Sequence, residues 1–127
     1  MNIDRWLLRV DPARRITIPI ELPEEVQYLF FEEVYITQGP DGCLRIYARK
    51  PEDVKGLSPI IHKVRVRIHH KHKKNNTVTL EHLKRITIPV EFVTSSTFYG
   101  EGKQVTMVWR ETYVELLPGD CRQMGEG

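Results

Sequence analysis

The chain has 127 residues, of which 40% are hydrophobic and 28% are charged, the composition of one globular domain or two very small ones. No apolar run approaches the roughly 20 residues that a membrane-spanning helix needs, and two cysteines are too few for a disulfide framework. The formal net charge is only +2, from 19 basic and 17 acidic side chains, so the total alone gives no indication of a polyanionic partner.

The charge is distributed unevenly along the chain. Residues 1–61 carry 8 basic and 10 acidic side chains, whereas residues 62–127 carry 11 basic and 7 acidic ones. Within residues 62–91, eight Lys and Arg residues stand against only two glutamates, a local balance of +6. Because a polyanion responds to local charge, this segment indicates either a nucleic-acid partner or an ordinary solvated basic face.

The first elements predicted along the chain are a β-hairpin and a short helix. Residues 6–10 have the pattern of a strand, and residues 11–14 (DPAR) form a type I turn with Asp first and Pro second. Residues 15–18 (RITI) alternate polar and β-branched apolar side chains, which predicts a half-buried strand. Pro19 ends this strand because proline cannot donate to a ladder, and a short helix is expected at residues 24–31.

Further hairpins are predicted in both halves of the chain. Residues 33–37 and 43–47 form strands on either side of residues 38–42 (QGPDG), which contain Gly-Pro and Asp-Gly turn formers. In the second half, two hairpins are likewise expected, from strands at residues 77–80, 85–88, 105–109 and 113–117.

The segment between the two halves, residues 51–76, fits two structures. Ile60, Val64 and Ile68 are spaced four apart, as on one face of a helix. Val64, Val66 and Ile68 also alternate with polar residues, as in a strand. Periodicity leaves both the helix and the strand open, and β-branching favours the strand only slightly.

The chain contains an internal repeat. Residues 15–21 (RITIPIE) recur as residues 85–91 (RITIPVE), with six of seven positions identical at an offset of 70 residues. The repeated unit of about 45 residues is too short to bury a good core alone. The two copies are therefore expected to pair in one pseudo-two-fold domain.

The repeated pattern resembles a known family. D-x-x-x-R-I-x-I-P at residues 11–19 recurs as E-x-x-x-R-I-x-I-P at residues 81–89, and this is similar to the AbrB-like swapped-hairpin family. The duplication, with DGCLRIY at residues 41–47 and VEL at residues 114–116 closing the two copies, most resembles the two-repeat MraZ branch. The family usually has Gly before the Arg, where this chain has Arg14 and Lys84.

The resemblance implies a mainly β structure with short helices (α+β), built as a swapped-hairpin β-barrel from two tandem repeats. It also implies a sequence-specific, DNA-binding transcriptional regulator that forms ring-like homo-oligomers and contacts DNA with its Asp-x-x-x-Arg hairpins. We expect a first repeat at residues 1–50, a basic, His-rich linker at 51–76, a second repeat at 77–118 and a flexible tail at 119–127.

Two basic hairpin tips are the predicted DNA-binding elements. Arginine can reach guanine O6 and N7 with two hydrogen bonds or clamp a phosphate, and Asp11 would orient Arg15. The alternative is an exposed salt bridge that closes the turn and contributes little. The candidate DNA-binding residues are Arg9, Asp11, Arg14, Arg15, Thr17, Glu81, Lys84, Arg85 and Thr87, with Lys71, Lys73 and Lys74 as auxiliary phosphate contacts. β-propensity alone would explain Thr17 and Thr87, and Arg9 also fits an ordinary outward strand residue.

The remaining motifs indicate no catalysis and no metal. The run HHKHKK at residues 69–74 has no carboxylate or cysteine to complete a metal site, so a solvated basic loop is the simpler interpretation. No nucleophile, phosphate-loop or dinucleotide motif is present, so we expect a protein that is not an enzyme and needs no cofactor or small-molecule substrate.

We therefore expect a cytoplasmic, nucleoid-associated regulator whose partner is double-stranded promoter DNA. Two alternatives remain: an antitoxin-like regulator of the same fold that also binds a protein, and an interaction module that binds protein only.

Overall fold

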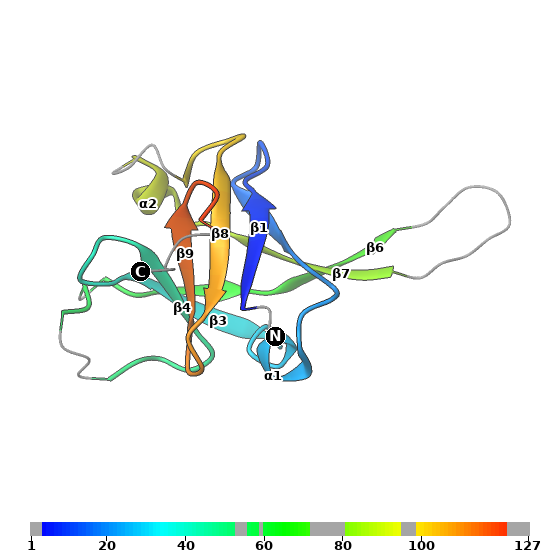
Figure 1. Ribbon diagram of the computed structural model, residues 1–127, viewed down its shortest axis with the longest axis horizontal. Helices are drawn as coiled ribbons and strands as arrows, with labels where there is room; N and C mark the ends of the chain where they lie inside the picture. The colour runs from blue at the N-terminus through cyan, green and yellow to red at the C-terminus, as the bar shows by residue number, and fades with distance from the viewer. Residues whose placement is uncertain (1–3, 53–55, 59, 72–80, 95–98, 122–127) are drawn as a thin grey trace, which may run out of the picture.

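The computed structural model describes residues 4–52, 56–58, 60–71, 81–94 and 99–121. These residues form two antiparallel sheets with two short helices, so the expected mainly β class is confirmed (Figure 1). The larger sheet has the strand order β1 (Arg5–Arg9), β8 (Gln104–Trp109), β9 (Val114–Pro118), β4 (Leu44–Tyr47), β3 (Glu33–Gln38) and β5 (His62–Arg65). The smaller sheet has the order β2 (Arg15–Ile18), β7 (Glu81–Thr87) and β6 (Arg67–Lys71), and the helices are α1 (Glu24–Gln27) and α2 (Val90–Thr94).

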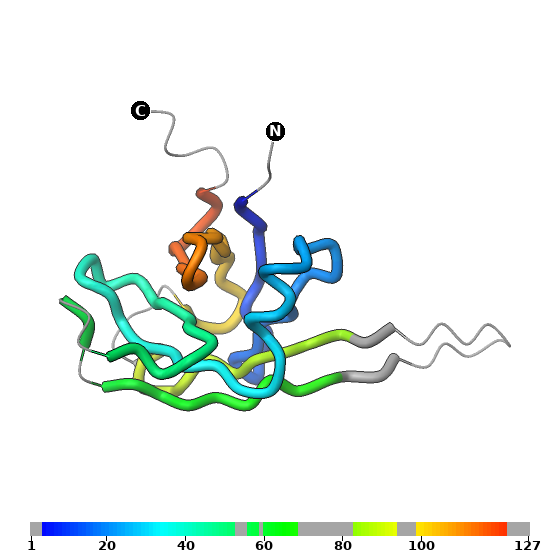
Figure 2. The backbone as a smooth tube through the Cα atoms, turned by 90° about the horizontal axis from the view of Figure 1, so that it is seen from below, coloured from blue at the N-terminus to red at the C-terminus, as the bar shows by residue number. Residues whose placement is uncertain are grey.

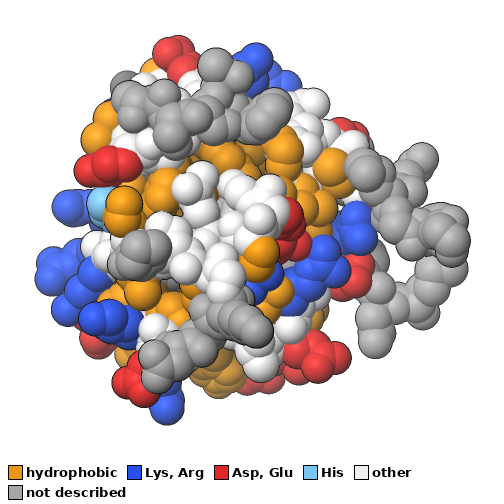
Figure 3. Space-filling view, turned by 90° about the vertical axis from the view of Figure 1, so that its left-hand side faces the viewer, with side chains coloured by type: hydrophobic (Ala, Val, Ile, Leu, Met, Phe, Trp, Pro, Cys, Tyr) orange, Lys and Arg blue, Asp and Glu red, His pale blue; other side chains and the backbone are white. Residues whose placement is uncertain are grey.

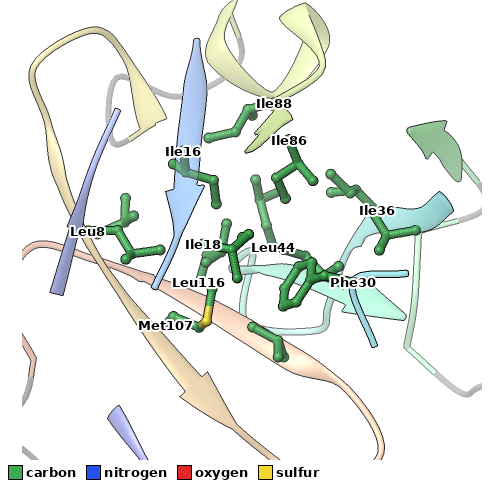
Figure 4. Close-up of a cluster of buried hydrophobic side chains, with 14 of the residues drawn as sticks. Leu8, Ile16, Ile18, Phe30, Ile36, Leu44, Ile86, Ile88, Met107 and Leu116 are labelled. Carbon is green, nitrogen blue, oxygen red and sulfur yellow. The ribbon is translucent and has the colours of Figure 1, made fainter. Parts of the chain in front are cut away.

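Both copies of the repeat contribute to one core between the sheets. Ile16 and Ile18 of β2 and Ile86 of β7 are at most 1% exposed, and Ile88, which follows β7, is fully buried. They meet apolar side chains of the larger sheet, including Leu44 and Met107 (Figure 4). The period-2 alternation of the RITI segments therefore buries their isoleucines and leaves the residues between them on the outer face.

The strand register joins matching residues of the two copies. In the β2–β7 pair, Ile16 lies opposite Ile86, Arg15 opposite Thr87 and Thr17 opposite Arg85. Each residue thus faces the partner strand in the same way in both copies, because the repeats are offset by 70 residues. The β4–β9 pair follows the same rule, with Arg45 opposite its counterpart Glu115.

The expected linker supplies two strands, which settles the choice between helix and strand for the described part of residues 51–76. β5 pairs with β3, and β6 pairs with β7. The pairing of β5 with β3 parallels that of β1 with β8: Val66 N–H donates to Glu32 O as Val10 N–H donates to Lys103 O, and both valines are buried. The strand that pairs with β3 thus comes from the segment expected to be a linker.

The second copy has no tight turn at residues 81–84, so that prediction is wrong. β7 runs without interruption from Glu81 to Thr87 and pairs along its first part with β6. The segment EHLK lacks the proline and aspartate that close the turn at DPAR, and β6 offers it a ladder partner instead. The strand expected at residues 77–80 lies outside the described residues. β6 and β7 leave the body of the molecule side by side (Figure 2).

Two smaller expectations also need correction. The first helix is only α1, because the chain after Gln27 continues in i→i+3 turns through Leu29 and Phe30. The start of the expected flexible tail is held by β8: Gly119 N–H donates to Gln104 O, and Cys121 N–H donates to the Thr106 hydroxyl, while residues 122–127 lie outside the described residues. Among the described residues, no helix is long and apolar enough to cross a membrane.

Candidate nucleic-acid interface

The hairpin between β1 and β2 closes with a three-residue loop. Asp11 N–H donates to Arg15 O and Arg14 N–H donates to Asp11 O, while the Asp11 carboxylate accepts from the backbone N–H groups of Ala13 and Arg15 at 2.9 and 2.8 Å. The aspartate therefore fixes the loop as an acceptor, in the manner of an Asx turn. This is the local reason for Asp at the start of the repeated pattern.

Arg14 occupies the left-handed region, with φ of 61°. The hairpin pattern that this segment resembles usually has glycine here, and the backbone has the conformation that glycine adopts freely although the residue is arginine. The Arg14 guanidinium lies near Ile88, with Nε 3.4 Å from Ile88 O, and Ile88 N–H donates back to Arg14 O at 2.7 Å. The side chain of Arg14 is thus directed along the β2–β7 seam.

Arg15 is oriented by Asp11. Its Nε donates to Asp11 Oδ2 at 2.8 Å, and the side chain remains 41% exposed. Burial, the largest single influence, raises the pKa of Asp11, but hydrogen bonds from the Arg15 backbone and side chain and from Ala13 N–H outweigh it and hold the pKa below its usual value. The Asp11 carboxylate engages Nε alone, so the two terminal amino groups of Arg15 remain directed elsewhere.

The outer face of the smaller sheet collects the arginines. Arg67 of β6 lies opposite Arg85 of β7, which lies opposite Thr17 of β2; in the next row, Thr87 lies opposite Arg15. Cross-strand partners share a face of the sheet, so these five side chains lie on the side away from the buried isoleucines. We call this set the arginine face.

Three arginines of this face line one hollow. The hollow has a volume of about 190 Å³ and is lined by Arg15, Arg67, Ile68, Arg85 and Thr87. Arg85 Nε is buried without a hydrogen-bond partner, and within the described residues no ion pair forms at Arg67 or Arg85. Like charges directly opposite in a sheet repel, so Arg67 against Arg85 is an unfavourable pair until an anion lies between them.

The basic surface continues onto β5. A second hollow of about 380 Å³ shares Arg67 and Thr87 with the first and is also lined by Lys63 and Arg65. Lys63 is paired with Glu33 at 3.2 Å, whereas no ion pair forms at Arg65 within the same described part of the chain. In Figure 3, which looks onto the end of the molecule at the left of Figure 1, basic side chains gather at the left edge of the view.

The residues predicted from sequence are brought together only in part. Arg15, Thr17, Arg85 and Thr87 lie on the arginine face. Lys84 does not: its Nζ lies 3.5 Å from Gln27 O, beside α1 and on the opposite side of β7 from Arg85.

The other predicted positions lie elsewhere. Arg9 is exposed at the end of β1, in the larger sheet. Lys71 and Glu81 are opposite each other in the β6–β7 ladder, where only their backbone is described. Lys73 and Lys74 lie outside the described residues, as do the side chains of residues 69–72 that raised the question of a metal.

Arg65 and Arg67 were missed by the sequence analysis. The signal was the alternation of Val64 and Val66 with these two arginines, which places both arginines on the solvent side once the segment is a strand. Because the periodicity of this segment fits both a helix and a strand, the sequence alone does not place the two arginines.

A second cluster of titratable groups lies at the β3–β4 loop. Ligand atoms of Asp41, Cys43 and Glu115 lie within 4.8 Å of one another, the only such trio of possible metal ligands among the described residues. Glu115 already accepts two hydrogen bonds from Arg110, at 2.9 and 3.2 Å. Burial, followed by the charges of Asp41 and Glu115, raises the pKa of Cys43 to about 11, so its thiol stays protonated. Glu115 is thus already paired with Arg110, and a protonated Cys43 thiol is a poor metal ligand.

Comparison with known proteins gives no relative: no protein-family model matches the chain, and no curated protein matches it.

Proposed function

We propose that this protein is a DNA-binding transcriptional regulator that contacts DNA with the arginine face of the β2–β7–β6 sheet. The observation that carries the proposal is the hollow where Arg15, Arg67 and Arg85 converge from three strands. The only acidic side chain paired with these arginines within the described residues is Asp11. Guanidinium groups form two parallel hydrogen bonds to phosphate or to guanine, which makes a polyanionic double helix the partner of best chemical fit.

The proposal includes the finer fold: a swapped-hairpin barrel of the AbrB-like type, with the chain as a two-copy member similar to the MraZ branch. The exchange of strands between copies supports it, because β1 pairs with β8 and β2 pairs with β7. Each copy thus completes a sheet of the other. Buried side chains of both sheets form a single core, which supports a barrel of this kind.

In the proposed mechanism the arginine face binds and reads DNA without catalysis. Asp11 holds Arg15 through Nε and fixes the guanidinium plane before DNA arrives, which lowers the entropy lost on binding. Arg85 supplies the matching group from the second copy, and Thr17 and Thr87 lie beside the arginines with hydroxyls suited to phosphate. Such a protein would act in the cytoplasm, on promoter DNA at the nucleoid.

We also propose that copies of the chain assemble into a ring-like homo-oligomer, which would multiply weak DNA contacts. Exposed apolar side chains near α1 support this, since Tyr28 is 67% and Phe31 is 68% exposed beside a hollow that includes Tyr35. A protein partner at the same surface is the alternative. Light scattering of the purified chain separates them: a single mass equal to the monomer would contradict self-assembly.

The test of DNA binding is titration of DNA from upstream of the protein's own gene across a salt series. A DNA-binding protein loses affinity steeply as salt rises. Replacing both Arg15 and Arg85 by Ala removes two charged contacts and should weaken binding by about a hundredfold or more.

Two controls accompany that variant. Lys50→Ala with Lys103→Ala removes the same charge from exposed positions that do not line the hollow and should change affinity by less than about threefold at physiological salt. Lys71→Ala, Lys73→Ala and Lys74→Ala together should also cost less than the arginine pair. Absence of DNA binding by the wild-type protein would refute the function, and normal binding by the arginine pair variant would refute the site.

A further inference from the structure

The hollow between β2, β6 and β7 has the properties of a site for one phosphate group. The register of the three strands sets the positions of the arginines. Arg67 lies opposite Arg85, and Arg15 lies opposite Thr87, two residues further along β7 on its other side. Cross-strand neighbours are about 5 Å apart and alternate residues about 7 Å apart, so the bases of the three arginine side chains lie within one small area. Their side chains then line the same space of about 190 Å³.

The donors in the hollow are already arranged to accept an anion. Asp11 occupies Arg15 through Nε, which leaves the terminal amino groups of Arg15 for another acceptor. Arg85 Nε is buried without a hydrogen-bond partner, a costly condition that an entering oxygen would relieve. The direct opposition of Arg67 and Arg85 is relieved by the same anion.

We propose that Arg15, Arg67 and Arg85 together hold one backbone phosphate of the bound nucleic acid. The inference rests on the proposed function, which supplies the phosphate from DNA. It adds a stoichiometry: three guanidinium groups bind a single phosphate. Arg67 becomes an essential member of the site although it lies outside both copies of the repeated motif. The tight hairpin and the β6–β7 ribbon then fix the position of DNA at the same point.

The first test uses inorganic phosphate alone. Melting of the full chain is followed in sodium phosphate and in sodium chloride of equal ionic strength. Phosphate should raise the melting temperature of the wild-type protein, because a ligand that binds only the folded state stabilises it. The variant with Arg15→Gln, Arg67→Gln and Arg85→Gln should show no such rise. An equal rise in both proteins, or no rise in either, would overturn the site.

The second test counts phosphates in DNA binding. The logarithm of the binding constant falls with the logarithm of salt concentration by about 0.9 for each neutralised phosphate. The triple Gln variant should therefore lose about one unit of slope if the three arginines share a phosphate, and about three units if each holds its own. A loss of about three units would overturn the proposal while leaving DNA binding intact.

A control that removes charge elsewhere is available on the same chain. Lys50→Gln and Lys103→Gln remove two positive charges from exposed positions that do not line the hollow. This variant should keep the phosphate-dependent rise in melting temperature and the wild-type salt slope. A wild-type protein that responds to phosphate but binds no DNA would support the anion site and refute nucleic acid as its source, so the two proposals fail separately.

Discussion

The two copies of the seven-residue repeat are preceded by different structures. In the first copy a three-residue loop, held by Asp11, turns the chain directly from β1 into β2. In the second, β5 is followed by the β6–β7 ribbon, and the chain enters its RITI segment along a continuous strand. The isoleucines are nevertheless buried to the same extent in both copies. The repeated segment therefore supplies the buried isoleucines and one arginine of the arginine face in each copy. The preceding segments differ, and they add Asp11 in the first copy and Arg67 in the second.

The largest expected effect concerns the shared inner face. Ile16→Ala and Ile86→Ala each remove a fully buried side chain from the centre of the β2–β7 pair and should each lower the free energy of unfolding by about 2–5 kcal/mol. Urea denaturation measures both. The two costs should agree within about 1 kcal/mol if the copies are equivalent inside, allowing for context. A much smaller loss of unfolding free energy for Ile86→Ala than for Ile16→Ala would show that the two copies are not equivalent in the core.

The next effect concerns a contact made only by the second copy. Tyr99 is 1% exposed; its hydroxyl donates to Leu116 O at 2.8 Å and accepts from Leu44 N–H at 3.2 Å, bridging β9 and β4. Tyr99→Phe leaves both backbone groups without this partner and should cost about 1–3 kcal/mol.

The matched control for that change is Tyr28→Phe. Tyr28 is 67% exposed and its hydroxyl bonds only Glu24, so the substitution should change stability by less than about 0.5 kcal/mol. Equal effects of the two substitutions in thermal or urea unfolding would contradict the role given to Tyr99.

A pair of glycine substitutions should have opposite effects on stability in the two copies. Arg14 is left-handed, so Arg14→Gly should stabilise the protein by about 0.5–1 kcal/mol through relief of backbone strain. Lys84 stands at the matching place in the repeat but inside β7, so Lys84→Gly should destabilise by about 0.5–1 kcal/mol. Chemical denaturation measures both. A change of stability in the same direction at both positions would mean that the backbone at Arg14 and Lys84 is alike in the two copies.

The smallest effect is a pH dependence at the tight loop. The folded protein holds the pKa of Asp11 below that of the unfolded chain, so the ionised carboxylate stabilises the fold above about pH 4. This contribution is lost as pH falls through the lower, folded pKa. Asp11→Asn should therefore narrow its stability gap to the wild-type protein in acid, as measured by denaturation between about pH 2 and 6. The exposed Glu101→Gln is the control, and a gap that is constant with pH would contradict the role of Asp11.

Much of the fold was predictable because local patterns and tertiary contacts agreed. The alternation at RITI, the Asp-Pro turn and the glycine-containing hairpin at residues 38–42 each produced the expected element. The β6–β7 ribbon was not predictable, since the motif at residues 81–89 resembles the first-copy motif that contains a tight turn, whereas the chain continues here as a strand. Its partner, β6, lies in a segment whose periodicity fits two structures, and only the tertiary pairing decides between them.

The candidate site was predictable to the same extent. Period-2 alternation was enough to group Arg15 with Thr17 and Arg85 with Thr87. Lys84 was grouped with Arg14 by the repeat, although within a strand it must face away from Arg85. Alternation with Val64 and Val66 could place Arg67 on the solvent side of a strand, but its position opposite Arg85 comes only from the register of two strands.

The pairing of β1 with β8 has a consequence for how the chain folds during synthesis. Arg5 lies opposite Val108, and its guanidinium also donates to Cys121 O at 2.7 Å. Because Val108 follows Arg5 by about 100 residues, the β1 ladder cannot form until that whole stretch has been synthesised, and such distant contacts slow folding. Until then β1 presents an unpaired edge, a state in which nascent chains associate with one another. A ribosome stalled soon after β4 would hold a chain that cannot yet fold.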